Sequence, residues 1–175
     1  MVFIVLFSCM AFVASAVRIN EIMYSPSTEL GGTYNEWIEL YNPSENPINL
    51  SNWLIADPDN HTFEVLTTDV IEANGYFILA KKPDNFSQYY NVTCPVARVV
   101  FSLNNNGEEV LLKNSSGDVI DNLTYDNSWG ADGNGNSLQL INGTWIESDH
   151  TAGLENQINE IAHNFAVHFL SLIHI

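Results

Sequence analysis

The sequence predicts an all-β fold, either a sandwich or a barrel, from residue 17 to about residue 140. Short apolar or alternating runs recur in this region, and Asn, Asp, Gly and Pro interrupt them every eight to twelve residues. Apolar residues show no helical periodicity there. The length of 175 residues, with 46% hydrophobic and 15% charged residues, fits one globular domain with its own core.

Each predicted strand is bounded by turn-forming residues. In chain order the strands are Arg18–Met23, Glu36–Tyr41, Ile48–Ala56, Thr62–Leu66, Tyr76–Ala80, Glu109–Lys113, Val119–Tyr125 and Ser137–Ile141. Pro or Gly supplies the turn geometry between several of them, as in Asn42-Pro43-Ser44. The segments Ser87–Arg98 and Asp126–Asn136 are predicted to be long loops, where binding residues usually lie.

Residues 1–16 are interpreted as a signal peptide. Val2–Val13 is mostly apolar, and Ala14-Ser15-Ala16 supplies the small-residue pattern that a signal peptidase cleaves, which makes Val17 the mature N-terminus. The apolar run is shorter than the roughly 20 residues that span a bilayer. A buried N-terminal strand is the alternative interpretation.

The frequency of glycosylation sequons agrees with export. Given the Asn, Ser and Thr content, chance would produce roughly three N-x-[ST] matches in this chain. The sequence contains seven, at Asn49, Asn60, Asn85, Asn91, Asn114, Asn122 and Asn142. Because a glycan does not fit into a packed interior, a secreted glycoprotein would carry these asparagines on its surface.

The C-terminal residues 157–175 differ in character from the rest of the chain. Apolar residues recur at helical spacing, which predicts a short helix, at Ile158, Ile161, Ala162, Phe165, Phe169 and Leu172. The final six residues, LSLIHI, instead resemble translated sequencing adaptor, so an artefactual tail is the second interpretation.

The charge balance excludes two classes of partner. Five Lys and Arg against 21 Asp and Glu give a net charge of −16. Phosphate backbones and anionic lipid headgroups would repel such a chain, so neither nucleic acid nor a membrane surface is expected as a partner. Calcium binding, solubility at high salt and attraction to a basic partner all remain compatible with this charge.

Several sequence blocks together resemble the lamin tail domain family, and its secreted bacterial and archaeal branch most. In order, the blocks are RINEIMYSP, GGTYNEWIELYNPSENPINLSNWLIAD, VIEANGYFILAKKPDNFSQYY, FSLNNNGEEVLLKNSSGDVIDNLTYD and ADGNGNSLQLI. The resemblance covers residues 17–156 and implies an immunoglobulin-like β-sandwich. The closing Gly/Pro-rich segment of the family is reduced here to TAGLEN.

The resemblance also implies a non-catalytic role. In secreted relatives such domains often precede spore-coat-kinase-like, nuclease or other hydrolase modules and mediate attachment or interaction. The chromatin and nuclear-envelope partners of the nuclear lamins are not transferred, because this chain has a predicted signal peptide and a charge of −16.

One loop has the composition of a calcium site. Asp126, Asp132, Asn134 and Asn136 carry oxygen atoms, the last three at alternate positions, although the glycines do not follow EF-hand spacing. A Gly/Asn-rich turn that leads into the last predicted strand is the alternative. Trp129 in the same loop would either stack on a ligand or cap the end of the sandwich.

Four acidic residues lie in predicted strands, where their carboxylates could have a catalytic or a structural role. Glu21, Glu36 and Glu39 come from two early strands and could form paired carboxylates for acid–base catalysis, whereas exposed strand faces are their default location in so acidic a chain. Asp121 alternates with apolar residues, so we expect it to be buried and to accept hydrogen bonds from backbone N–H groups at a strand bend.

Sequence motifs for nucleophilic or metal catalysis are missing: there is no G-x-S-x-G, H-E-x-x-H, P-loop or dinucleotide fingerprint.

Cleavage of the signal peptide would remove Cys9 and leave Cys94, which is interpreted as a partly buried free thiol or as a link to a second chain.

The sequence therefore favours a secreted, non-catalytic interaction or attachment module, monomeric by itself and forming the N-terminal part of a longer extracellular protein. No cofactor is expected apart from the calcium considered above. The first alternative is a carbohydrate-active or other hydrolase domain that uses surface carboxylates. The second is a structural spacer covered in glycans.

Overall fold

The early strands build one large sheet, because their alternating apolar residues give it a face to bury. The structure is a computed structural model that describes residues 17–59, 61–65 and 70–158. Six strands pair in this order: β12 (Thr144–Asp149), β11 (Asn136–Ile141), β1 (Arg18–Met23), β2 (Trp37–Tyr41), β7 (Tyr76–Ala80) and β8 (Val96–Arg98). All neighbours are antiparallel except β7 and β8.

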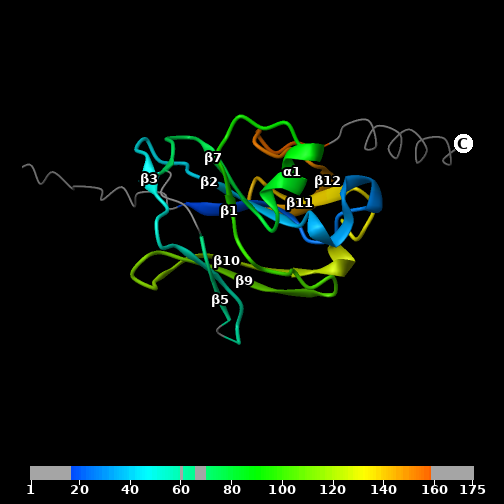
Figure 1. Cartoon of the computed structure of the whole chain (residues 1–175), viewed down its shortest axis with the longest axis horizontal. Coiled ribbons are helices and arrows are strands. Elements are labelled where there is room, and N and C mark those ends of the chain that lie inside the picture. Colours follow the sequence, from blue (N-terminus) through cyan, green and yellow to red (C-terminus); the bar gives the residue numbers. More distant parts are fainter. Residues whose placement is uncertain (1–16, 60, 66–69, 159–175) are drawn as a thin grey trace, which may run out of the picture.

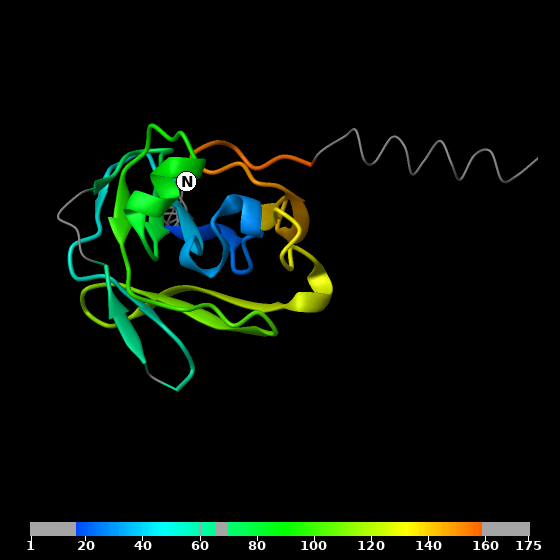
Figure 2. The same cartoon turned by 45° about the vertical axis from the view of Figure 1, so that its right-hand side comes forward.

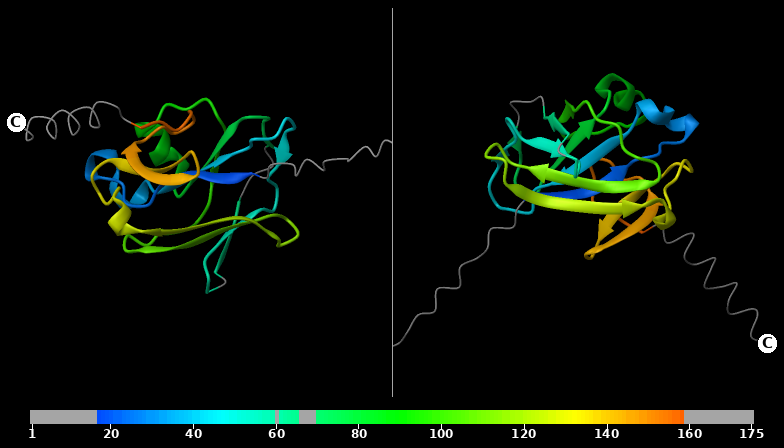
Figure 3. Two further views of the ribbon diagram at one scale, coloured as in Figure 1. Left: turned by 180° about the vertical axis from the view of Figure 1, so that it is seen from behind. Right: turned by 90° about the horizontal axis from the view of Figure 1, so that it is seen from below.

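A smaller sheet lies below the large one in Figure 1. Its four strands pair in the order β10 (Val119–Asp126), β9 (Gly107–Lys113), β4 (Leu54–Ala56) and β5 (Thr62–Glu64). A short ribbon of β3 (Ile48–Asn49) and β6 (Val70–Ile71) stands at one end of the two layers. The view from below in Figure 3 shows β9 and β10 running side by side beneath the larger sheet.

The main core fills the space between the two sheets. The larger sheet contributes Ile19, Ile22, Ile38, Leu40, Phe77, Leu79 and Leu138, all fully buried. The smaller sheet contributes Ile55, Val110, Leu112, Leu123 and Tyr125. This arrangement confirms the predicted immunoglobulin-like β-sandwich.

The outer face of the larger sheet is also covered. The helix α1 (Pro83–Tyr89) packs Phe86 against Trp37, and Tyr90 extends this second apolar cluster. Residues 151–157, which we call the C-terminal strap, cross the same face, where Ala152 joins the cluster. Figure 2 shows α1 and the strap, coloured orange, on the side of the sheet opposite β9 and β10.

Two three-residue 3-10 segments, η1 (Thr28–Leu30) and η2 (Gly32–Tyr34), connect β1 to β2. A third, η3 (Asn127–Trp129), follows β10 directly. The predicted loop Asp126–Asn136 therefore begins with a helical turn at the edge of the sandwich.

The structure corrects the predicted strand Ile48–Ala56. A turn with Asn52 in the left-handed region (φ 60°) separates β3 from β4, and the two strands belong to different sheets. Because the chain turns at Asn52 and passes from one sheet to another, residues 48–56 do not form one continuous strand.

The structure also contains elements that the sequence pattern did not predict. The expectation of no helix before residue 140 is wrong, because α1 starts at Pro83. The predicted loop Ser87–Arg98 is wrong in part, since it includes the end of α1 and the strand β8. The strands β6 and β12 were also missed.

Some predictions fall outside the described residues. These are the signal peptide at residues 1–16, the end of predicted strand Thr62–Leu66 and the C-terminal helix or artefactual tail beyond residue 158. Within the described ranges, no helix is long and apolar enough to cross a membrane.

Candidate functional site

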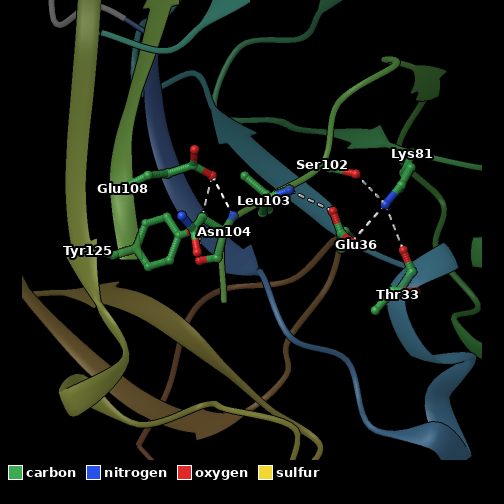
Figure 4. A network of polar contacts seen from close by, with 8 residues as sticks. All are labelled: Thr33, Glu36, Lys81, Ser102, Leu103, Asn104, Glu108 and Tyr125. Carbon is green, nitrogen blue, oxygen red and sulfur yellow. Dashed lines mark hydrogen bonds and ion pairs between the residues drawn. The ribbon is translucent and has the colours of Figure 1, made fainter. Parts of the chain in front are cut away.

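Glu36 is buried and forms an ion pair with Lys81 (Figure 4). Lys81 Nζ donates to Glu36 Oε1 (2.8 Å), to the carbonyl of Thr33 (2.9 Å) and to Ser102 Oγ (2.8 Å). The other carboxylate oxygen accepts from the backbone N–H of Leu103 (2.8 Å). Burial raises the pKa of Glu36 more than Lys81 and Leu103 lower it. The ion pair fixes the chain where it crosses from β8 toward the smaller sheet.

The same network continues into the smaller sheet (Figure 4). The Tyr125 hydroxyl donates to the carbonyl of Asn104 (2.8 Å) and to Glu108 Oε1 (3.1 Å). Glu108 also accepts from the backbone N–H of Asn104 (2.7 Å). Burial, followed by the nearby Glu108 carboxylate, raises the pKa of Tyr125. These contacts hold the loop before β9 in place.

Glu21 and Glu39 lie directly opposite each other on β1 and β2. Both side chains point to the outer face of the larger sheet, and both are fully buried. The default expectation of exposed carboxylates on a strand face is therefore wrong for both residues, and for Glu36. For Glu21 and Glu39 the reason is that α1 and the C-terminal strap cover this face of the sheet. Glu36 is instead buried against Lys81 and Leu103, in the part of the chain that leads to the smaller sheet.

The C-terminal strap supplies most of the hydrogen bonds to the pair. Thr151 donates from its backbone N–H to Glu21 Oε1 and from its hydroxyl to Glu21 Oε2, both at 2.9 Å. Gly153 N–H donates to Glu39 Oε2 (2.6 Å). Ser137 Oγ donates to Glu21 Oε1 (2.5 Å), and Asn20 Nδ2 donates to Glu39 Oε1 (2.8 Å). All of these donors are neutral.

The Thr151 hydroxyl also connects the pair to Asn156 of the C-terminal strap. It lies 2.9 Å from Glu21 Oε2 and 3.1 Å from Asn156 Oδ1. Asn156 Nδ2 in turn donates to the carbonyls of Asn20 and Leu140, which fixes the strap to β1 and β11.

Both carboxyls of the pair have raised pKa values. Burial raises the pKa of Glu21 to about 7. Burial and then the charge of Glu21 raise the pKa of Glu39 to about 8. A general acid must also reach its substrate, and neither carboxyl is exposed or lines either groove described below. The pair is thus a structural element that fastens the C-terminal strap.

The predicted calcium loop is organised around Glu147 of β12. Glu147 Oε1 accepts from Ala131 N (2.9 Å), from Asn136 Nδ2 (3.1 Å) and from Asn134 Nδ2. The two asparagines therefore present amide nitrogens, which cannot ligate calcium, to this carboxylate. Burial favours a higher pKa for Glu147, but these three hydrogen bonds hold it below the usual range.

The other predicted calcium ligands lie apart from that contact. Asp126 caps η3 by accepting from Ser128 N (2.8 Å), and Asp132 is exposed. No group of three or more His, Cys, Asp or Glu side chains suited to a metal occurs in the described part of the chain. Calcium binding at this loop stays a prediction, to be tested as described in the Discussion.

Asp121 behaves largely as its alternation with apolar residues predicts. It is half-buried, and its carboxylate accepts from the backbone N–H of Ile19 (2.7 Å) and of Asn122 (2.9 Å). The register of β10 shifts at this point, and β1 shifts between Ile19 and Glu21. Asp121 therefore connects the two sheets at a pair of strand irregularities.

The sequons and the cysteine remain predictions about modification. Asn49, Asn91, Asn122 and Asn142 are exposed. Asn85 and Asn114 are half-buried, and Asn60 lies outside the described residues.

Cys94 is a half-buried free thiol beside the cluster on the outer face. Burial, and then the nearby Glu39, raise its pKa to about 12, so the thiol is not activated. This placement matches a partly buried free thiol, and a link to a second chain stays untested.

The surface has an open groove beside the C-terminal strap. This groove, which we call the Arg18 groove, has a volume of about 330 Å³ and is lined by Arg18, Tyr41, Tyr76, Asn142 and Glu155 among others. The Arg18 guanidinium lies 5.0 Å from the centre of the Tyr41 ring, which in turn packs against Tyr76 at 5.1 Å. Sequence reasoning missed these residues, because β1, β2 and β7 are not adjacent in sequence.

A second groove runs along β12. This groove, which we call the Trp129 groove, has a volume of about 570 Å³ and is lined by Trp129 and residues 143–147. Trp129 of η3 is 42% exposed, so the structure places it where a ligand could stack on it. Trp145 is half-buried and packs partly against the core. The Asn142-Gly143 dipeptide was a hairpin signal that could have revealed β12.

Comparison with known proteins agrees with this architecture. The family model of the Lamin Tail Domain matches residues 11–127, which include β1 to β10. No curated protein matches the chain. Since the matched part is well over half of the sequence, the chain belongs to the lamin tail domain family, a family of immunoglobulin-like, non-enzymatic interaction domains.

Proposed function

We propose that this protein is a secreted module for interaction or attachment, which binds its partners through surface grooves and carries out no catalysis. The observation that carries the proposal is a contrast within one molecule. The three glutamates considered for acid–base chemistry are buried and held by hydrogen bonds, whereas the Arg18 groove and the Trp129 groove each include two aromatic side chains in their lining. Aromatic residues beside polar groups are typical of binding surfaces.

Export is supported by the apolar leader with its small-residue cleavage pattern and by the number of sequons. Expression of the full chain in a secretory eukaryotic cell tests this part of the proposal. We expect protein in the medium that begins at Val17 and loses mass on enzymatic deglycosylation. Retention in the cell with residues 1–16 intact would contradict export.

The hydrolase alternative is tested separately on the secreted protein. We expect no turnover of a panel of chromogenic glycosides and esters between pH 5 and pH 8 (about the range in which a tuned carboxyl acts). Turnover that Glu39→Gln or Glu21→Gln abolishes, while Asp84→Asn on the exposed surface of α1 leaves it unchanged, would replace the binding proposal with catalysis.

Binding itself is tested by immobilising the secreted protein and crosslinking it to extracellular proteins of its own source. A double variant, Tyr41→Ala with Trp129→Ala, alters both grooves, and we expect it to lose the captured partners. Tyr34→Ala removes an aromatic ring that is 57% exposed and lines neither groove, so it is the control. Equal capture by both proteins would contradict binding through the grooves.

A further inference from the structure

The Trp129 groove differs from other parts of the surface because a strand edge forms one of its walls. β12 is the last strand of the larger sheet, and β11 is its only partner strand within the described residues. Five consecutive residues, 143–147, line the groove, so it follows the β12 backbone. Trp129 stands opposite on η3.

We propose that the Trp129 groove binds an extended, positively charged segment of a partner protein, which adds as a further strand to the edge of β12 at residues 144–147. This inference rests on the proposed function and names the partner chemistry of one of its two grooves. Main-chain hydrogen bonds to an open edge supply affinity, and the side chains on either side supply selectivity.

The negative charge around the groove favours a basic partner. Glu147 lines the groove, and Asp126 caps η3, which carries Trp129. Burial, and then Asp132, Glu147 and Asp126, raise the pKa of Tyr24, so the three charges lie near one another. Tyr24 is positioned at this end of the sandwich, where its hydroxyl donates to the carbonyl of Gly130 (2.5 Å). Among the residues that the structure describes, the lining of the groove contains no Lys or Arg.

Three of the five Lys and Arg residues of the protein have contacts away from the groove. Lys81 pairs with Glu36, Arg18 lies over the Tyr41 ring, and Lys82 lies over the Tyr34 ring. With a total charge of −16, the protein would attract a basic segment over some distance and repel an acidic one.

The side chains of the groove suit the same partner. A Lys or Arg side chain can stack on the exposed ring of Trp129 and remain close to a carboxylate. Exposed strand edges are commonly protected from pairing by Lys or Pro, but residues 144–147 contain neither. Glu147 would accept a basic strand at this edge and disfavour an acidic one.

Fluorescence anisotropy of a labelled peptide on the secreted full chain tests the inference. The probe is a peptide of about eight residues with alternating Lys and Thr, which is long enough, when extended, to pair with residues 144–147. We expect saturable binding that weakens as salt is raised. We expect no binding of the same peptide with Glu in place of Lys. A version methylated on alternate backbone nitrogens cannot pair as a strand, so we also expect it to lose binding.

Three variants locate the contact. Trp129→Ala should weaken binding at least about fivefold, and Asp132→Asn about twofold, because the first removes the stacking ring and the second one nearby charge. Tyr89→Ala is the matched control, since Tyr89 has the same 42% exposure but lies outside the groove. We expect it to bind like the unaltered protein.

Three results would overturn the inference: equal affinity for the Lys and Glu peptides, unchanged binding of the methylated peptide, or unchanged binding by Trp129→Ala. Saturable binding of a neutral oligosaccharide in the groove, with no peptide binding, would also overturn it. If partners from the extracellular crosslinking experiment are still captured in any of these cases, the proposed interaction function stands while this partner chemistry fails.

Discussion

Glu36 and Glu39 belong to the same short stretch of sequence, yet the protein buries them in opposite ways. Glu36 has a cation, Lys81, at 2.8 Å and a backbone N–H on its second oxygen. Glu39 faces a second carboxyl, Glu21, and receives hydrogen bonds from neutral donors alone. A carboxylate with a lysine can remain charged when buried, whereas two adjacent carboxyls without a cation are stable only if protons neutralise them.

The comparison also separates two structural roles. The ion pair of Glu36 fixes the loop that leads from the larger to the smaller sheet. The Glu21–Glu39 pair fastens the C-terminal strap to the outer face of the larger sheet. Both sites stabilise the sandwich, and we expect them to respond differently to mutation and to pH.

The largest effect is expected when Glu36 loses its cation. Lys81→Met should lower the free energy of unfolding by about 3 to 5 kcal/mol, because it leaves a buried carboxylate without its cation. Urea denaturation at pH 7 measures the change. Lys82→Met is the adjacent control, since Lys82 is exposed and contacts the Tyr34 ring, and we expect a loss below about 1 kcal/mol. Equal losses in both variants would show that the ion pair does not stabilise the fold.

A smaller effect is expected at the C-terminal strap. Gly153 has a φ of +77°, and an added Cβ would lie 3.1 Å from Val92, so Gly153→Ala should cost about 2 to 3 kcal/mol. It should also speed up hydrogen exchange of the Thr151 amide, which donates to Glu21. Gly143→Ala is the control, because Gly143 has a φ of +80° but no atom within 4 Å of an added Cβ. We expect it to cost about 1 kcal/mol and to leave the exchange unchanged. The same exchange rate in both variants would contradict a fastened strap.

The smallest effect concerns Glu147, a carboxylate with neutral donors that is not fully buried. Its hydrogen bonds to Ala131, Asn134 and Asn136 hold the pKa low, so it is charged at neutral pH and already satisfied. We therefore expect calcium at about millimolar concentration to leave the melting temperature unchanged, since a ligand that binds the folded state would raise it. A rise that Asp132→Asn removes would establish the predicted calcium loop instead.

Much of the fold could be predicted because its strands have clear boundaries. β1, β2 and β7 alternate or run apolar between turn residues, and the structure confirms them with shifts of at most one residue. The helix α1 was missed because it has seven residues and a single buried one, Phe86, so no helical period can develop. β12 was missed because its polar residues hide the alternation.

The environment of the acidic residues could not be predicted in the same way. Glu21, Glu36 and Glu39 look alike in sequence, but Glu36 has a lysine as its partner, whereas the protonation of Glu21 and Glu39 depends on what covers the outer face of the sheet. That cover comes from α1 and from the strap, which follows Glu39 by more than a hundred residues. Asp121 was predicted more successfully, because its apolar neighbours in β10 already indicate burial.

The pH dependence of stability tests the central claim most directly, namely that Glu21 and Glu39 form a neutral structural pair. Both have raised pKa values in the folded protein, about 7 and about 8, above the 4.5 of an ordinary glutamate. Their contribution is therefore complete below about pH 4.5 and is lost as pH rises through 7 and 8. The free energy of unfolding falls by about 1.4 kcal/mol per pH unit for each carboxyl that is protonated in the folded protein and ionised in the unfolded protein.

The measurement compares the free energy of unfolding of the protein and of Glu39→Gln from about pH 5 to about pH 9. The glutamine side chain has one oxygen fewer than glutamate, so the variant loses the acceptor for Gly153 N–H at a cost of about 1 kcal/mol at every pH. The test is therefore the slope of the unfolding free energy against pH, and not its absolute value. We predict that the unaltered protein loses stability with rising pH and that Glu39→Gln loses clearly less. Parallel curves for the two proteins would contradict a protonated pair beneath the strap.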